Sequence, residues 1–257
     1  MSNIIRSTEG DSSPIDRIAE PAGRRTFLKW SGASVAGAAL FLAGCSDEDT
    51  QTIVDVTPTP PTPPAPDAQN PSGAPAVTLN FANDFGILNF AFALEQLEAA
   101  FYTQVIATQY TGMTEQERRI LIDIRDHEIV HREFFRTAIT ALGPTTLIGN
   151  LVPNFASINF ASRESVLTTA RTFEDLGIAA FNGAAGFLQS VDILNIAGKI
   201  VSVEARHASA IRDLLRPRSQ NFAPSSLDES LPPSRVLAAA DPFIQNPITV
   251  QNPPAGF

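Results

Sequence analysis

Two copies of one short motif combine a carboxylate with an imidazole. Residues Glu128 to His131 and Glu204 to His207 both read E-x-x-H. On a helix, residues three positions apart share a face, so each motif points one carboxylate and one imidazole in the same direction. A single motif of this kind arises by chance or from surface salt bridges. These two motifs use two of only three histidines in the chain, which favours a metal-binding site.

The region before and around the first motif has the periodicity of two antiparallel helices. Apolar residues at three- and four-residue steps predict a helix over about 84–109. Thr111-Gly112 predicts a turn, and Thr114 with Glu117 forms a capping box, in which a Thr cap is followed three residues later by Glu. The second helix is expected to continue until Gly143-Pro144 ends it.

A second pair of helices is expected after a long connection. Residues 143–161 lack clear periodicity, and Ser162 is a good N-cap for a third helix that should end around Gln189-Ser190. The fourth helix follows at once and stops before Pro217, and a short helix is expected over 233–240. Such a long connection fits a bundle in which a crossover running along the helices joins two hairpins.

Two further glutamates lie level with the motifs in these hairpins. Residues equidistant from the turn of an antiparallel hairpin sit at the same height. The midpoint of Glu95 and Glu128 falls in the first predicted turn, and that of Glu174 and Glu204 falls in the second. The spacing therefore predicts one six-residue metal site, formed by Glu95, Glu128, His131, Glu174, Glu204 and His207.

An aromatic residue follows the first glutamate of each hairpin by seven positions. These residues are Tyr102 after Glu95 and Phe181 after Glu174. Seven residues is close to two helical turns, so both rings are expected on the ligand face. Tyr102 is interpreted with equal weight as a core aromatic or as a catalytic residue, a redox or hydrogen-bonding partner of the metals.

Two other residues near the motifs are not counted among the ligands. Glu98 lies one turn from Glu95 and is interpreted either as a residue outside the ligand shell or as part of a solvated face. His127 precedes Glu128 and should point about 100° away from it. We therefore expect His127 at the surface or at an interface.

The predicted ligand set is typical of ferritin-like di-iron and di-manganese carboxylate proteins. The segments LEQLEAAFY (94–102), HEIVH (127–131) and VEARH (203–207) resemble the bacterial ferritin-like family related to plant desiccation-associated proteins. The resemblance covers about residues 80–245. The expected fold is an all-α, ferritin-like four-helix bundle with a long crossover between the second and third helices and a short C-terminal helix.

Two iron or manganese ions are the expected cofactors. Four carboxylates in a bundle core would repel one another or take up protons, and two divalent cations would neutralise all four. Carboxylate with imidazole suits iron and manganese, although zinc can bind as well. The expected function is binding a dinuclear centre that reacts with oxygen or peroxide, in oxidative or desiccation stress or in iron handling.

Other functions compete with this one. The main alternative is a metal-free or structural helical bundle with a protective role, so the sequence leaves open whether the protein is an oxidoreductase. Iron storage ranks last, because a lipid-anchored stalk on every subunit disfavours a closed cage. The net charge of −9 excludes a nucleic-acid partner, since too few cations are present to release counterions. The oligomeric state is left open.

The N-terminal residues predict an export signal. Arg24-Arg25 followed by Thr-Phe-Leu-Lys resembles the twin-arginine signal, with Gly23 where Ser or Thr is usual. The mildly apolar stretch 30–44 is too short for an ordinary spanning helix. It ends in Leu-Ala-Gly-Cys45, which resembles a lipobox whose cysteine is lipidated. We expect a bacterial protein that uses the twin-arginine machinery and is anchored by Cys45 to a membrane of the periplasm or cell envelope.

The composition of the following segment predicts a tether. Residues 57–66 are almost all Pro and Thr, which cannot form a helix and favour an extended chain. The expected organisation is a signal peptide at 1–45, a Pro/Thr-rich disordered tether at 46–76, the four-helix bundle at 77–216, and a Pro-rich C-terminal segment at 217–257 whose short helix packs on the bundle.

Overall fold

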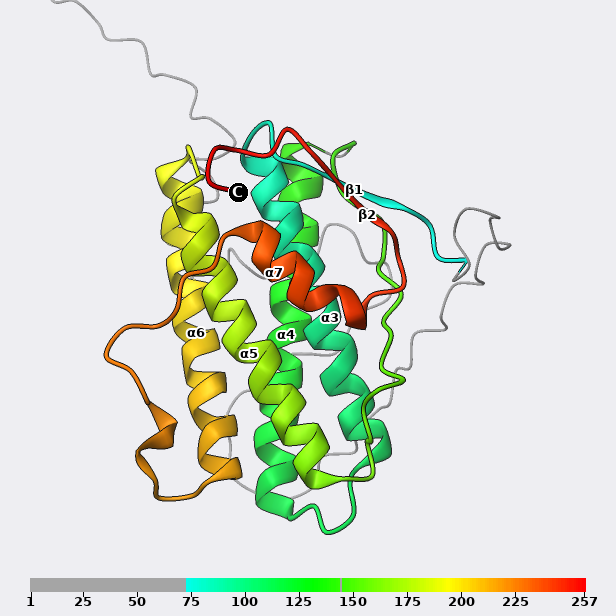
Figure 1. Cartoon of the computed structure of the whole chain (residues 1–257), viewed down its shortest axis with the longest axis vertical. Coiled ribbons are helices and arrows are strands. Elements are labelled where there is room, and N and C mark those ends of the chain that lie inside the picture. The colour runs from blue at the N-terminus through cyan, green and yellow to red at the C-terminus, as the bar shows by residue number, and fades with distance from the viewer. Residues whose placement is uncertain (1–72, 144) are drawn as a thin grey trace, which may run out of the picture. The chain divides into compact units, whose positions relative to one another are not determined.

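A computed structural model describes residues 73–143 and 145–257, which form a bundle of four long helices (Figure 1). The predictions for Arg24, Arg25, Cys45 and the 57–66 run lie outside the described residues. The long helices are α3 (Asp84–Thr108), α4 (Glu115–Leu142), α5 (Arg163–Ala185) and α6 (Val191–Leu215). The predicted fold class, an all-α helical bundle, is confirmed.

Helices α3 and α4 form the first hairpin and pack on each other along their length. The side chain of Asn83 caps α3 by accepting a hydrogen bond from the backbone N–H of Phe85. Gly112 adopts a φ of +79° in the connecting turn, a conformation that favours glycine. Thr114 and Glu117 form the predicted reciprocal capping box at the start of α4. These local signals fix the height at which the two helices face each other.

Helices α5 and α6 form the second hairpin. Helix α5 begins after the Ser162 cap, as expected, but it ends at Ala185 instead of around Gln189-Ser190. The α-helical hydrogen bonding ends there, because the N–H of Phe187 bonds to the carbonyl of Ala184, three residues back instead of four. Phe187 and Leu188 continue the apolar pattern of α5, so the periodicity predicts a helix that extends beyond its actual end.

The long crossover from α4 to α5 runs along the bundle beside α3 (Figure 1). Its backbone is held by two amide side chains of α3. Asn89 donates to the carbonyl of Thr146 and accepts from the N–H of Ile148, at 2.8 and 2.9 Å. Gln96 accepts from the N–H of Leu151 at 2.9 Å. The described residues of the crossover, from 145 on, are thus held against the bundle although they contain no helix or strand.

The N- and C-terminal parts of the domain meet in a small parallel sheet that the sequence did not predict. Strand β1 (Val77–Asn80) pairs with β2 (Ile248–Gln251), with Val77 opposite Ile248. The predicted short helix is present as α7 (Pro233–Ala240) and packs on α5. Two short 3₁₀ segments, η1 (Gln220–Phe222) and η2 (Asp241–Phe243), complete the described elements.

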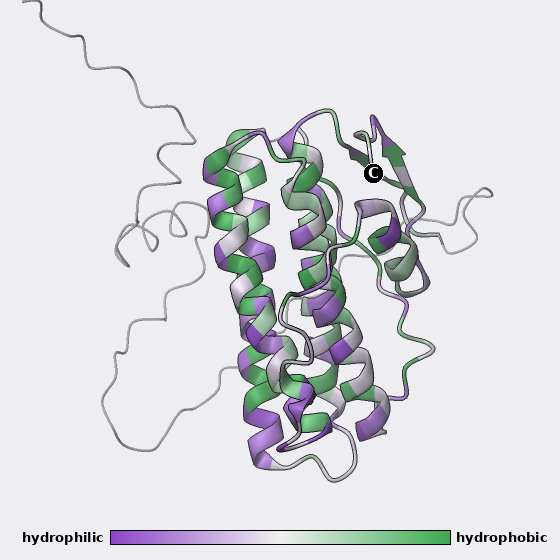
Figure 2. Cartoon of the chain, turned by 60° about the vertical axis from the view of Figure 1, so that its left-hand side comes forward, coloured by the Kyte–Doolittle hydropathy of each residue, from purple (hydrophilic) through white to green (hydrophobic). Residues whose placement is uncertain are grey.

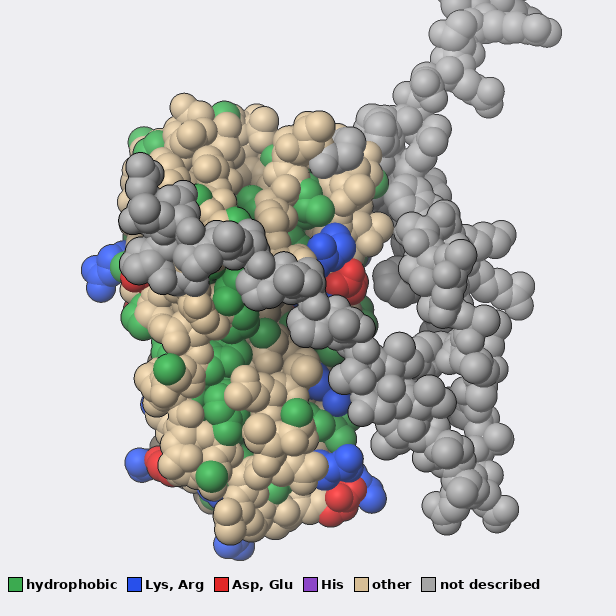
Figure 3. Space-filling view, turned by 90° about the vertical axis from the view of Figure 1, so that its right-hand side faces the viewer, with side chains coloured by type: hydrophobic (Ala, Val, Ile, Leu, Met, Phe, Trp, Pro, Cys, Tyr) green, Lys and Arg blue, Asp and Glu red, His purple; other side chains and the backbone are tan. Residues whose placement is uncertain are grey.

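The core lies between the long helices, whose hydrophobic and hydrophilic residues alternate around each helix (Figure 2). Phe101 is fully buried, and its ring meets those of Phe155, Phe160 and Phe173, so crossover residues join the core. On the face drawn in Figure 3, acidic and basic side chains lie together in small groups. Within the described residues, no helix combines the length and apolarity needed to cross a membrane.

Candidate metal centre

The structure brings all six predicted ligand residues together inside the bundle. Each long helix contributes: α3 carries Glu95, α4 carries Glu128 and His131, α5 carries Glu174, and α6 carries Glu204 and His207. Their ligand atoms form two groups, within each of which all atoms lie within 4.8 Å of one another. The first group is Glu95, Glu128, His131 and Glu204, and the second is Glu128, Glu174, Glu204 and His207.

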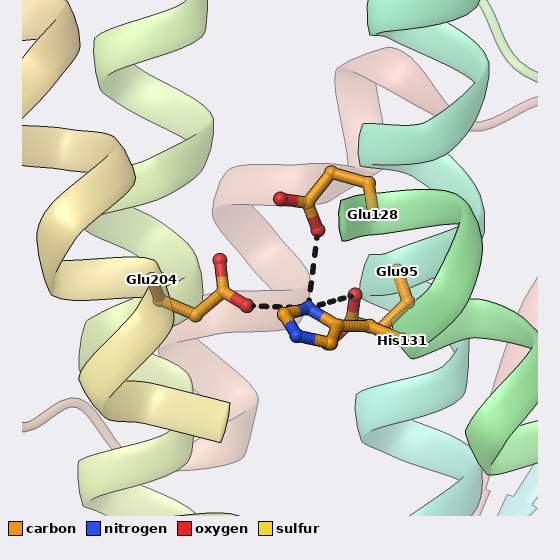
Figure 4. Close-up of side chains that lie close together, drawn as sticks. All are labelled: Glu95, Glu128, His131 and Glu204. Carbon is orange, nitrogen blue, oxygen red and sulfur yellow. Dashed lines mark ion pairs between the residues drawn. The ribbon is translucent and has the colours of Figure 1, made fainter. Parts of the chain in front are cut away.

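In the first group, three carboxylates surround one imidazole nitrogen (Figure 4). The Nδ1 atom of His131 lies 2.8 Å from an oxygen of Glu204, 3.5 Å from one of Glu95 and 3.6 Å from one of Glu128. The four side chains come from three helices and point toward one another. This convergence on one point is the arrangement that a coordinated cation requires.

The second group repeats the pattern around His207. Its Nδ1 atom lies 2.7 Å from an oxygen of Glu128 and 3.4 Å from oxygens of Glu174 and Glu204. Glu128 and Glu204 belong to both groups, each offering one oxygen to either imidazole. Two groups that share two carboxylates are suited to a pair of ions, with the shared carboxylates between them.

Most of the buried ligand atoms of the site have no aligned hydrogen-bond partner. The four glutamates are fully buried, and His207 is 4% exposed. Among the described residues, eleven buried side-chain nitrogen and oxygen atoms lack a hydrogen bond, and nine of them belong to the six predicted ligand residues. Their short contacts are therefore not aligned as donor–acceptor pairs. Buried polar atoms without partners are rare in native proteins, and a bound cation would satisfy these.

Burial and neighbouring charges perturb the glutamates in opposite directions. Burial raises the pKa of Glu95 well above its ordinary value, and it raises the pKa of Glu174 to about 8. Burial acts on Glu128 in the same direction, but the close imidazoles of His131 and His207 outweigh it and lower its pKa to about 2. Without a cation, the site therefore keeps protons on some carboxyl groups while Glu128 stays ionised.

The two imidazoles hold their protons tightly in this environment. Burial alone would lower their pKa values, but the surrounding carboxylates raise the pKa of both His131 and His207 to about 12. Each histidine therefore balances part of the negative charge as an imidazolium ion. A histidine that binds a metal must be neutral, so metal binding at this site has to displace these protons.

Tyr102 contacts the site directly. Its side chain is fully buried, and its hydroxyl donates a hydrogen bond of 2.5 Å to Glu174. Burial and the nearby carboxylates raise the pKa of Tyr102 well above its ordinary value, so the phenol stays protonated as a donor. Phe181, the residue at the corresponding place in α5, packs against Phe135 and has no hydroxyl to offer. Of the two roles considered for Tyr102, the structure therefore favours a hydrogen-bonding partner of a ligand over a plain core aromatic.

Glu98 is a buried fifth carboxylate beside the cluster, not part of a solvated face. It is 4% exposed, and burial with the charges of Glu128, Glu204 and Glu174 raises its pKa well above the ordinary value. One of its oxygens lies 3.0 Å from where a Cβ would stand at Gly177. Glycine at this position of α5 makes room for the Glu98 side chain.

His127 is exposed, as expected, but its ring reaches back to the site. Its Nδ1 atom lies 2.8 Å from Nε2 of His207. The angle between His127 and Glu128 on one helix does not reveal that His127 faces α6. Only the packing of α4 against α6 reveals this contact.

Comparison with family models identifies the family of this chain. A sequence model of a family described as a ferritin-like domain matches residues 83–217, more than half of the chain. The matched range begins at the cap of α3 and ends just after α6, so it includes the four long helices and all six site residues. No curated protein matches the chain.

Proposed function

Because the chain belongs to the ferritin-like domain family, we propose that it holds two iron or manganese ions and that the loaded protein reacts with oxygen or peroxide. The observation that carries the proposal is the set of nine buried ligand atoms without hydrogen bonds, arranged in two groups around shared carboxylates. Hydrogen bonds would satisfy these atoms in a purely structural bundle. These atoms instead converge in two groups, within each of which all ligand atoms lie within 4.8 Å of one another.

The chemical types of these residues fit the proposed ions. Glu95, Glu128, His131 and Glu204 would hold one ion, and Glu128, Glu174, Glu204 and His207 the other. Oxygen and imidazole ligands suit iron and manganese, and also accept zinc. When bound, two redox-active ions supply the two electrons that convert hydrogen peroxide and two protons into two molecules of water.

The protein's own residues supply the setting for this reaction. The four buried carboxylates balance the charge of two divalent cations, and the bundle keeps bulk water away from them. Tyr102 holds Glu174 in place through its hydroxyl. We also propose Tyr102 as a redox partner of the bound ions: its phenol, which is buried beside a ligand, would give one electron to the oxidised ions and its proton to the Glu174 carboxylate.

The proposed setting is outside the cytoplasm. The twin-arginine pair would carry the folded, metal-loaded protein across the membrane, and lipidated Cys45 would anchor it in the periplasm or cell envelope. A role in oxidative or desiccation stress, or in iron handling, follows as a proposal from this location and from the family resemblance.

Melting temperature and reactivity together test the function. Metal that binds only the folded state stabilises it by about 2.7 kcal/mol at a hundredfold excess over the dissociation constant. Fe(II) or Mn(II) should therefore raise the melting temperature of the full-length protein. Peroxide or oxygen should then change the absorbance of the loaded protein, and Glu128→Ala and His207→Ala should abolish both effects. A melting shift without any reaction would favour a structural metal site. The absence of a shift with every divalent metal tested would contradict both the reactive and the structural metal site.

A further inference from the structure

His207 joins the buried cluster to a solvent-facing side chain. One ring nitrogen, Nδ1, lies among the carboxylates of the second group, while Nε2 lies 2.8 Å from Nδ1 of His127. The two rings are stacked, with centroids 5.1 Å apart and planes inclined by 19°. His207 is 4% exposed, whereas His127 lies at the surface. The contact therefore links the buried cluster to the protein surface between α4 and α6.

A cation at the second group would fix the hydrogen-bond roles in this pair. A neutral imidazole that gives its Nδ1 lone pair to a metal carries its hydrogen on Nε2. Nε2 of His207 would then donate, and Nδ1 of His127 would accept. Partners of this kind hold a ligating histidine in one tautomer and orientation and make it a stronger ligand.

The first group has no such support. The residue that precedes Glu204 in the second motif is Val203, whose side chain has no hydrogen-bonding atom. Among the described residues, every ion-pair contact of His131 is with a carboxylate of the site. Both oxygens of Glu95 also lack a hydrogen bond, whereas Glu174 receives one from Tyr102. Two residues of the second group, His207 and Glu174, therefore have a hydrogen-bonding partner outside the ligand set. The corresponding residues of the first group, His131 and Glu95, have none among the described residues.

We propose that His127 is a positioning residue that makes the two metal positions unequal. The position formed with Glu174 and His207 binds first and more tightly, and His127 sets its affinity by holding the His207 ring. This inference rests on the proposed function, because it requires the cluster to bind cations. It goes beyond that function in two ways: it states which metal position is occupied first, and it gives a role to His127, which is not a ligand.

Stepwise binding of Mn(II) to the metal-free, detergent-solubilised full-length protein tests this inference by calorimetry. The wild type should show two steps of unequal affinity. His127→Leu should weaken the tighter step roughly tenfold to hundredfold, the usual effect of losing such a partner, and leave the weaker step unchanged. His127→Asn should restore the tighter step to near its wild-type value, because its amide oxygen can accept in place of Nδ1. Val203→Ala, at the corresponding place in α6, should change neither step.

Two measurements separate positioning from a general effect on folding. The metal-free His127→Leu variant should still unfold in a single cooperative transition, since His127 is exposed and lies outside the core. In the Zn(II)-loaded wild type, nitrogen NMR should show the His207 ring protonated at Nε2. Unchanged steps in His127→Leu, equal weakening of both steps, or no rescue by Asn would overturn the inference while leaving the proposed function intact. A wild type that binds no Mn(II) would overturn both.

Discussion

At the scale of the residue, the site is a set of charges that the bundle tolerates only with compensation. Glu95, Glu128, Glu174 and Glu204 are fully buried, and His131 and His207 are the cations that face them. Unpaired charge in a protein interior is costly, so a buried group either binds a partner or changes its protonation state. In the metal-free protein, bound protons compensate the negative charge of the glutamates. Metal ions would replace these protons.

This protonation makes the metal-free protein sensitive to pH. Folding raises the pKa of Glu174 from an ordinary 4.5 to about 8, and that of His207 from 6.5 to about 12. In each case the folded state keeps a proton that the unfolded state has lost. The stabilising contribution is therefore complete below the ordinary pKa and is lost as pH rises toward the folded value.

We expect the free energy of unfolding of the metal-free protein to fall between about pH 5 and about pH 9, by on the order of 1 kcal/mol per pH unit for each such group. The lowered pKa of Glu128 adds no slope in this window. Urea unfolding at a series of pH values measures the trend. Glu174→Gln should reduce the slope below about pH 8, the raised pKa of Glu174, by the share of that one group, whereas Glu133→Gln, at a side chain that is 46% exposed, should not. A wild-type stability that is constant or rises with pH would contradict this assignment.

The chain's two tyrosines offer a matched comparison of buried hydroxyls. Tyr102→Phe removes the donor to Glu174 and leaves that carboxyl without a hydrogen bond, so we expect a loss of about 1–3 kcal/mol in the metal-free protein. Tyr110 is also buried, but its hydroxyl lies near the Glu117 carboxylate without an aligned hydrogen bond. Tyr110→Phe should therefore be close to neutral in the same unfolding measurement. Equal losses for both variants would argue against a role of the Tyr102 hydroxyl at the site.

At the scale of the element, the crossover shows how a long irregular segment is kept in place. Its backbone groups find partners on α3, chiefly the side chain of Asn89, which bonds to both Thr146 and Ile148. The N–H of Val152 bonds in the same way to the side chain of Asn246 from the C-terminal segment. Amide side chains thus replace the regular hydrogen bonds that a helix or strand would have provided.

Asn89→Ala should destabilise the fold by about 1–3 kcal/mol, because it leaves the buried N–H of Ile148 unpaired and removes the donor to the carbonyl of Thr146. Asn182→Ala serves as the control, since Asn182 makes one exposed bond to the carbonyl of Glu229, and it should stay within about 0.5 kcal/mol of the wild type. Chemical unfolding of the metal-free proteins gives both values. If Asn89→Ala were as stable as Asn182→Ala, the crossover would not depend on this amide.

The sequence was sufficient for the elements that local signals define. The capping box at Thr114, the cap at Ser162 and the glycine turn at Gly112 all lie where expected, and equal spacing from the turns placed the six site residues together. The parallel pairing of β1 with β2 could not be predicted, because each strand has four residues and the partners are far apart in sequence. The His127 contact was missed for a similar reason: it joins α4 to α6, which are not neighbours in the chain.

At the scale of the whole molecule, the bundle is one part of a chain whose N-terminal residues predict an export signal. The family match spans residues 83–217, and the predicted export features precede it at Arg24-Arg25 and Cys45. A ferritin-like domain on a lipid-anchored stalk would place its metal chemistry beside a membrane. This placement is a proposal that cell fractionation can test.

Two sets of substitutions separate export from anchoring. Replacing Arg24 and Arg25 with Lys should keep the protein in the cytoplasm, because twin-arginine sorting depends on that pair. Cys45→Ser should leave export intact but move the protein from the membrane fraction to the soluble fraction, since the acyl chains would be absent. Immunoblots of the fractions measure both effects. Unchanged membrane partition of Cys45→Ser would refute lipidation at this residue.

The central claim is that six residues on four helices hold two metal ions, and metal content tests it most directly. Protein purified from its native host should contain close to two equivalents of iron or manganese per chain, measured by elemental analysis. Glu128→Ala and Glu204→Ala should each lose most of this metal, because each carboxylate belongs to both groups. Glu133→Ala, at a half-exposed side chain outside both groups, should keep it. Wild-type protein without bound metal, or full occupancy in the Glu128 and Glu204 variants, would contradict the claim.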